Sequence, residues 1–216
     1  MYERLLFWST VCLLVIGKTS CDSVKQANNY LDNVLSSKLK RSDQIKNIKL
    51  PEFDTESRDR ILFITSRVRT SYSKGDLHNL ENVVRLGDCL PHSTVVAKSV
   101  ECTLQFKHLR AEYQASLKYG RLPKIPIRAK ALMKPIDAKI EVESRVPRNI
   151  PELIKFQLIT PIEIDVSYKG MGFLNRYLRI LKNDFVEKMR NHLYAAINND
   201  FKAELKKSLS LVDLKL

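Results

Sequence analysis

The sequence of 216 residues contains little glycine, proline or tryptophan, with six Gly, eight Pro and a single Trp. A chain so poor in Gly and Pro is neither collagen-like nor a long flexible linker. The tripeptide Asn-x-Ser/Thr does not occur, which excludes N-linked glycosylation. With 44% hydrophobic and 28% charged residues, the composition is that of a globular protein.

Motifs for enzyme chemistry are also missing. The sequence has no Gly-x-Ser-x-Gly and no phosphate-binding loop, and a Gly-x-Gly-x-x-Gly pattern that starts at Gly170 has Asn175 in place of its last glycine. The four histidines have no His, Cys or Glu at metal-ligand spacing. We therefore predict that the protein is not an enzyme and has no catalytic residue, no metal and no cofactor.

A long uncharged segment, Leu5 to Ile16, lies near the N-terminus and is followed by small residues. It is too short for a membrane-spanning helix, which needs about 20 residues. The pattern predicts a secretory signal peptide over residues 1–21, cleaved after Thr19 or Cys21. An uncleaved anchor is the alternative. Residues 22–216 would then form one domain of a secreted, extracellular protein.

Helical periodicity marks both ends of this domain. Apolar residues recur at steps of three and four from Val24 to Leu39, which predicts an amphipathic N-terminal helix. The same spacing extends from Leu174 to Leu209 without Gly or Pro and predicts one long C-terminal helix. A helix of that length needs a long apolar surface to lie against.

Between the helices, apolar residues alternate with polar ones, as in strands that have one buried face. We predict a hairpin of residues 96–106 and 109–119, closed at Lys107-His108. A further strand is predicted from Ile154 to Tyr168, with a bend at Pro161. The fold class that follows is α+β, with a highly curved antiparallel sheet wrapped around the long C-terminal helix.

Two cysteines remain after the signal peptide, Cys89 and Cys102. A turn at Pro91-His92-Ser93 would set Cys89 opposite Val95, about 20 Å along the strand from Cys102. That separation is outside the reach of a disulfide. We therefore predict two free, buried thiols. A disulfide between them is the alternative, because an even number of cysteines in an exported chain favours one.

Positive charge exceeds negative charge, with 37 Lys and Arg against 24 Asp and Glu, a formal net charge of +13. Basic residues cluster within 38–49, within 121–148 and along the C-terminal helix. These basic residues favour an anionic membrane surface as a partner. The alternative is that they serve only to keep the secreted protein soluble. No nucleic acid is expected, because acids alternate with the bases and no platform of exposed aromatics is evident.

A curved sheet and long helices can leave an elongated apolar cavity between them, and the expected ligand is then a lipid or another hydrophobic small molecule. The residues predicted to line it lie on the buried faces of strands and of the long helix: Cys102, Leu104, Tyr113, Ala115, Phe156, Leu158, Ile164, Leu178, Leu181, Phe185 and Met189. The alternative function is an extracellular protein-interaction module with a fully packed core and a basic docking face.

Three stretches together resemble the group 7 mite allergens: Leu77-His78-Asn79-Leu80, Arg85-Leu86-Gly87-Asp88 and residues 95–120. The resemblance in the order of elements covers essentially all of residues 22–216. It implies a fold similar to one half of bactericidal/permeability-increasing protein, as in the wider lipid-binding and juvenile-hormone-carrier group. It also implies a secreted protein without catalytic residues that binds lipids or lipopeptides weakly.

Overall fold

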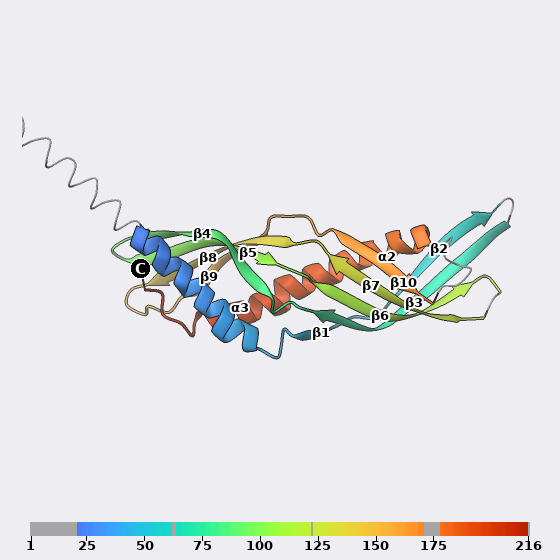
Figure 1. Cartoon of the computed structure of the whole chain (residues 1–216), viewed down its shortest axis with the longest axis horizontal. Coiled ribbons are helices and arrows are strands. Elements are labelled where there is room, and N and C mark those ends of the chain that lie inside the picture. Colours follow the sequence, from blue (N-terminus) through green and yellow to red (C-terminus); the bar gives the residue numbers. More distant parts are fainter. Residues whose placement is uncertain (1–20, 62–63, 122, 171–177, 216) are drawn as a thin grey trace, which may run out of the picture.

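The computed structural model describes residues 21–61, 64–121, 123–170 and 178–215. The predicted signal peptide, Cys21 apart, lies outside these residues. No described helix is long and apolar enough to cross a membrane. The molecule is elongated, and the N-terminal helix starts beside the C-terminal end of the chain (Figure 1).

The described strands form two antiparallel sheets. The first sheet has the order β1-β3-β6-β7-β10, with β2 paired to β3, and the second has the order β4-β5-β8-β9. The strands of the first sheet are β1 (Asn47–Leu50), β2 (Phe53–Ile61), β3 (Ile64–His78), β6 (Arg110–Tyr119), β7 (Ile125–Met133) and β10 (Ile164–Lys169). Those of the second are β4 (Val83–Ser93), β5 (Ala97–Phe106), β8 (Ile136–Arg145) and β9 (Glu152–Leu158).

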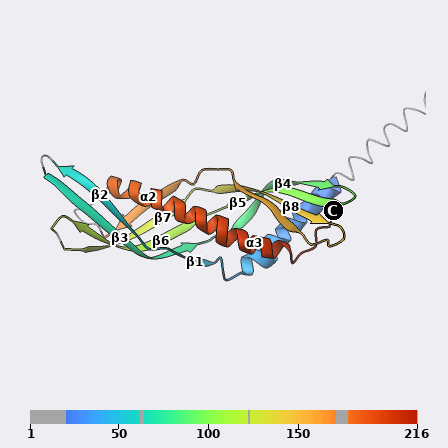
Figure 2. The same ribbon diagram turned by 180° about the vertical axis from the view of Figure 1, so that it is seen from behind.

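Both predicted helices are present. The N-terminal helix covers residues 21–33 and continues through a π-helical turn (η1, Val34–Lys38) into a 3-10 turn (η2, Leu39–Arg41). The C-terminal helix runs without a break through α2 (Leu178–Ala195), a π-helical turn (η4, Ala196–Phe201) and α3 (Lys202–Leu209). Its predicted start at Leu174 lies outside the described residues. The long helix faces the viewer in Figure 2, where it runs along both sheets.

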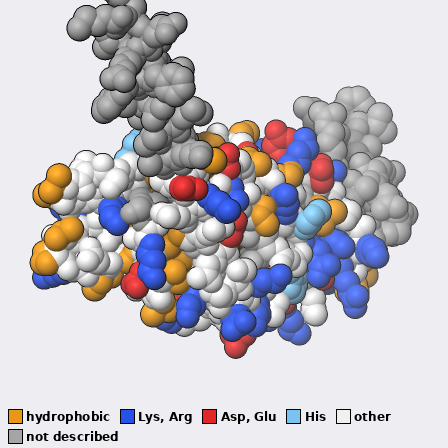
Figure 3. Space-filling view, turned by 60° about the vertical axis from the view of Figure 1, so that its left-hand side comes forward, with side chains coloured by type: hydrophobic (Ala, Val, Ile, Leu, Met, Phe, Trp, Pro, Cys, Tyr) orange, Lys and Arg blue, Asp and Glu red, His pale blue; other side chains and the backbone are white. Residues whose placement is uncertain are grey.

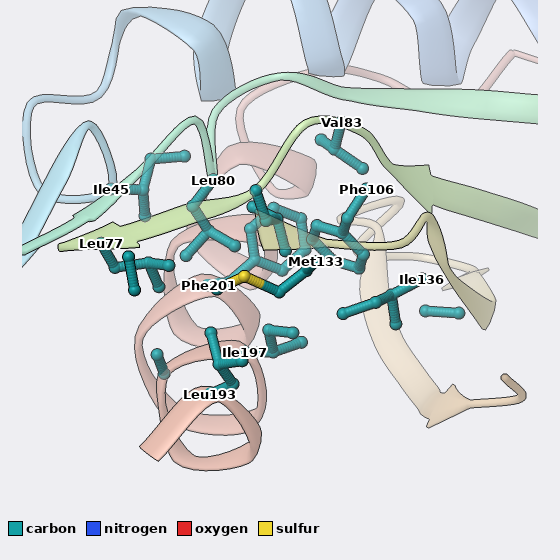
Figure 4. Packing of buried hydrophobic residues seen from close by; sticks show 14 of the residues in the cluster. Ile45, Leu77, Leu80, Val83, Phe106, Met133, Ile136, Leu193, Ile197 and Phe201 are labelled. Atoms are coloured by element: carbon teal, nitrogen blue, oxygen red, sulfur yellow. The ribbon is translucent and has the colours of Figure 1, made fainter. Parts of the chain in front are cut away.

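The core lies where the apolar stripe of the long helix meets the inner faces of the sheets. Leu193, Ile197 and Phe201 point from the helix toward the strands in Figure 4. Their partners include Leu77 and Phe106, and all five side chains are buried. The predicted fold class, α+β with antiparallel strands around a long C-terminal helix, is therefore confirmed, with the strands divided between two sheets.

The predicted hairpin of residues 96–106 and 109–119 is wrong. Both segments are strands, but β5 pairs with β4 and β8, whereas β6 pairs with β3 and β7. His108 has a positive φ of 57° at the point where the chain leaves one sheet for the other. Alternation predicted the buried face of each strand correctly, but it carries no information about which strand lies beside it.

Two further strand predictions also differ from the structure. β7 (Ile125–Met133) was not predicted, although it alternates buried and exposed residues along most of its length. The predicted strand from Ile154 to Tyr168 is divided around Pro161 into β9 and β10, which belong to different sheets. Proline lacks the N–H that would continue the ladder, so an interruption at this residue has a direct cause.

The prediction of free thiols at Cys89 and Cys102 is also wrong, because the two residues form a disulfide with Cα atoms 4.5 Å apart. β4 continues through the predicted turn as far as Ser93, and the chain reverses at residues 94–96 instead. A bulge between Leu86 and Leu90 then brings Cys89 beside Cys102, since Leu90 lies opposite Glu101. The misplaced turn moved Cys89 along the strand and out of range.

Candidate ligand site

The inner face of the first sheet meets α2 in a cluster of aromatic side chains. Rings of Phe53, Tyr72, Tyr113 and Tyr168 surround Phe185, with centroid distances from 5.0 Å to 6.1 Å. Phe185 is fully buried. Aromatic pairs at these separations contribute about 0.5–1.5 kcal/mol each beyond their area burial, so this cluster fixes the helix on the sheet.

The tyrosine hydroxyls in this cluster are hydrogen bonded within the protein. The Tyr72 hydroxyl lies 3.0 Å from that of Tyr168, which donates to the Leu181 carbonyl at 3.1 Å. The Tyr113 hydroxyl donates to the Pro51 carbonyl at 3.1 Å. Because their polar atoms are satisfied, these rings present apolar surface toward the interior.

Burial disfavours the charged forms of the titratable side chains in the cluster. It raises the pKa of Tyr72 to about 12 and also raises the pKa values of Tyr113 and Tyr168 above their ordinary range. His192 lies beside Phe53, with ring centroids 5.2 Å apart. Burial, and then the positive charge of Lys188, lowers the pKa of His192. The neutral imidazole and phenols suit an apolar environment.

The structure divides the predicted lining residues between the two sheets. Tyr113, Ala115, Ile164, Leu181, Phe185 and Met189 lie on the first sheet and α2. Cys102, Leu104, Phe156 and Leu158 lie on the second sheet. Leu178 begins α2, but its side chain lies outside the described part of the structure. The full set therefore does not converge on one point, and it extends along the length of the long helix.

Burial separates the same residues into core and margin. Seven of them are buried core residues: Cys102, Leu104, Tyr113, Ala115, Leu181, Phe185 and Met189. Phe156, Leu158 and Ile164 are only half-buried and pack against the core from its margin. Ile162 and Val186 share this position. We call the five half-buried residues the open seam, since they follow the line where β9 and β10 meet the helix.

A surface hollow of about 580 Å³ opens on the open seam. Ile164 and Val186 supply its apolar lining, and Lys182 and Arg190 supply two cations beside Glu187. The Arg190 Nε donates to the Ile162 carbonyl at 3.1 Å, which ties the chain between β9 and β10 to α2. Apolar side chains beside cations match an amphiphile with an acidic head.

Several residues of this region were not predicted from the sequence. Phe53, Tyr168 and Val186 were not among the residues predicted to line the cavity. Tyr168 lies two two-residue steps beyond Ile164 on the same strand face, and Val186 lies three residues before Met189 on the helix, so the period of each element leads from a predicted residue to each of them. Phe53 has no such signal.

The described side chains include no group of three or more His, Cys, Asp or Glu that could hold a metal ion. The structure thus offers no metal centre within these residues. The absence of a catalytic role stays a prediction.

Comparison with known proteins gives a family and two similar folds. A comparison with curated sequences finds no match. Takeout 1 of Epiphyas postvittana has a TM-score of 0.44 and 13% identity, over 86% of this chain and 91% of that chain. Lipopolysaccharide binding protein has a TM-score of 0.47 and 12% identity, over 85% of this chain and 40% of that chain. The sequence model described as Group 7 allergen matches residues 26–207, and the chain belongs to this family.

Proposed function

We propose that the protein is a secreted, non-enzymatic binding protein whose ligand is a lipophilic molecule held along the open seam. The observation that carries the proposal is the row of half-buried apolar side chains between β9, β10 and the long helix. Elsewhere along the helix the apolar stripe is buried by the sheets. Residues of the open seam keep part of their apolar surface exposed, and a lipophile that covers it gains about 25 cal/mol per Å².

The hollow at the open seam favours a ligand with an acidic head. Lys182 and Arg190 lie beside the apolar pair Ile164 and Val186, so a chain could lie on the apolar residues while its head contacts the cations. A fatty acid has this arrangement. A neutral hydrocarbon would leave both cations without a ligand partner.

The test is uptake of a fluorescent fatty acid by the purified protein and by a variant, Ile164→Ser with Val186→Ser. We expect the variant to bind severalfold more weakly, because polar side chains replace half-buried apolar surface. Leu132→Ser is the matched control, since Leu132 is 49% exposed on the outer face of β7, where it lies opposite Asp165 and on the side of the sheet that faces away from the helix. Equal binding by all three proteins would contradict the proposal.

Native mass spectrometry of the secreted protein gives an independent measurement. Co-purifying lipid that is lost in the open-seam variant would support the proposal. A protein without lipid that also takes up no fatty acid would instead favour an extracellular protein-interaction module with a packed core.

A further inference from the structure

The outer face of the first sheet carries a row of polar side chains that crosses four strands. Ser73 of β3 lies opposite Gln114 of β6. Gln114 in turn lies opposite Arg128 of β7, and Arg128 lies opposite Lys169 of β10. Directly opposed residues of neighbouring strands have Cβ atoms about 5 Å apart, so these four side chains form one continuous row.

A surface hollow of about 710 Å³ lies over this row. Its polar lining consists of hydroxyl, amide and cationic groups, from Ser71, Ser73, Ser116, Gln114, Arg128 and Lys169. An adjoining hollow of about 440 Å³ shares Gln114, Arg128 and Lys169, and adds Lys74 and Lys130. The two hollows therefore meet at the pair of cations on β7 and β10. On the face of the molecule shown in Figure 3, Lys and Arg side chains gather into basic patches.

The positive charge of this pair is not balanced within the described residues. Arg128 and Lys169 are like charges in opposed positions of a sheet, an arrangement that destabilises it. Neither forms an ion pair with a described carboxylate, and both side chains are exposed.

The two acids of the adjoining hollow already have partners. Asp76 forms an ion pair with Lys49 at 2.5 Å, and Glu112, which lies opposite Lys130, forms one with Arg110 at 3.3 Å. An external anion is therefore the group that would relieve the repulsion between the cations of β7 and β10.

We propose that the hollow over Arg128 and Lys169 binds a phosphate group. A guanidinium offers paired N–H donors and an ammonium offers a point charge, the combination by which proteins hold phosphate oxygens. The serine hydroxyls and the Gln114 amide add neutral donors for the remaining oxygens. The phosphate could belong to a lipid headgroup or to a soluble phosphate ester. This outer site lies on the opposite face of the sheet from the apolar core and needs no lipophile in the open seam.

The test compares Arg128→Gln with Lys169→Gln in one chain against the unaltered protein. Lys202→Gln with Lys206→Gln is the matched control, because it removes two exposed positive charges from α3. Removing a repulsion should leave the melting temperature of the site variant unchanged or higher. Two probes are used: glycerol 1-phosphate by calorimetric titration, and phosphatidylcholine vesicles with or without phosphatidic acid by co-sedimentation.

We expect the site variant to bind phosphatidic acid vesicles less well by about fivefold for each cation removed, while the control pair changes little.

Binding of glycerol 1-phosphate that is lost in the site variant would show that a soluble phosphate ester is sufficient. Vesicle binding alone, lost in the site variant, would assign the site to a headgroup. The proposal is overturned if the unaltered protein binds neither probe, or if the control pair weakens binding as much as the site variant. Fatty acid uptake by the site variant should stay normal, which separates this proposal from that of the open seam.

Discussion

At the scale of single residues, Gly75 shows how a missing side chain positions the aromatic cluster. It lies in β3 within the register shift between Ser73 and Asp76. A Cβ at this position would lie 2.3 Å from the ring of Tyr113. Tyr113 therefore packs against the backbone of β3, which places its ring beside Phe53 and Phe185.

Gly75→Ala should lower the free energy of unfolding by about 1–3 kcal/mol, because the added methyl group overpacks this contact. Urea denaturation measures the change. The same substitution made in a Tyr113→Leu background should cost clearly less, since the ring that it meets is gone. An equal cost in both backgrounds would show that the close approach to Tyr113 is not the cause.

At the scale of elements, the bulge of β4 holds the N-terminal helix in place. Arg85 donates from Nε and Nη2 to the two carboxylate oxygens of Asp32, at 3.0 Å and 2.8 Å. Asn28 accepts from the Cys89 backbone N–H at 2.9 Å and donates to Asp88 at 2.8 Å. Because Cys89 is also joined to Cys102 of β5, the helix, the bulge and the second sheet form one connected unit.

Replacing both cysteines, Cys89→Ser with Cys102→Ser, should therefore destabilise the protein by about 3 kcal/mol, the value expected for a disulfide that closes a short loop. Chemical denaturation of the variant and of the unaltered protein gives this difference. Alkylation of the unaltered protein under denaturing, non-reducing conditions should leave both residues unlabelled. Labelling of Cys89 and Cys102 without reductant would contradict the disulfide.

The same elements show what the sequence can and cannot predict. Periodicity located both helices and the buried faces of β5 and β6, because the pattern depends only on which side of an element meets the core. Strand partners were mispredicted, since the same alternation results from any neighbouring strand. One misplaced turn near Ser93 was enough to separate Cys89 from Cys102.

In the candidate site, buried and half-buried residues share the same parity along each strand, so the sequence could not separate the core from the open seam.

At the scale of the whole molecule, the predicted signal peptide determines where the secreted chain begins. We propose that the signal peptide, residues 1–19 or 1–21, is removed on secretion, which discards Trp8 and Cys12 together with Arg4 and Lys18. The described part of the chain begins at Cys21 and forms the N-terminal helix directly from there.

The secreted protein should therefore begin at Ser20 or Asp22 and contain no tryptophan. N-terminal sequencing of protein collected from the culture medium tests the first point, and the tryptophan band of its fluorescence spectrum tests the second. Recovery of a chain that begins at Met1 would support an uncleaved anchor instead.

The path of the chain between the two sheets has a consequence for folding. The chain leaves the first sheet after β3, returns for β6 and β7, leaves again for β8 and β9, and returns for β10. No single cut in the sequence therefore yields two pieces that each contain a complete sheet. Neither sheet is built from one continuous segment, and the pairs that join its hairpins, β3 with β6 and β7 with β10 in the first sheet and β5 with β8 in the second, close over long sequence separations. Because the chain passes from one sheet to the other four times, the two ends of this molecule should form and unfold together as one cooperative unit. The long-range pairings should also make folding slow.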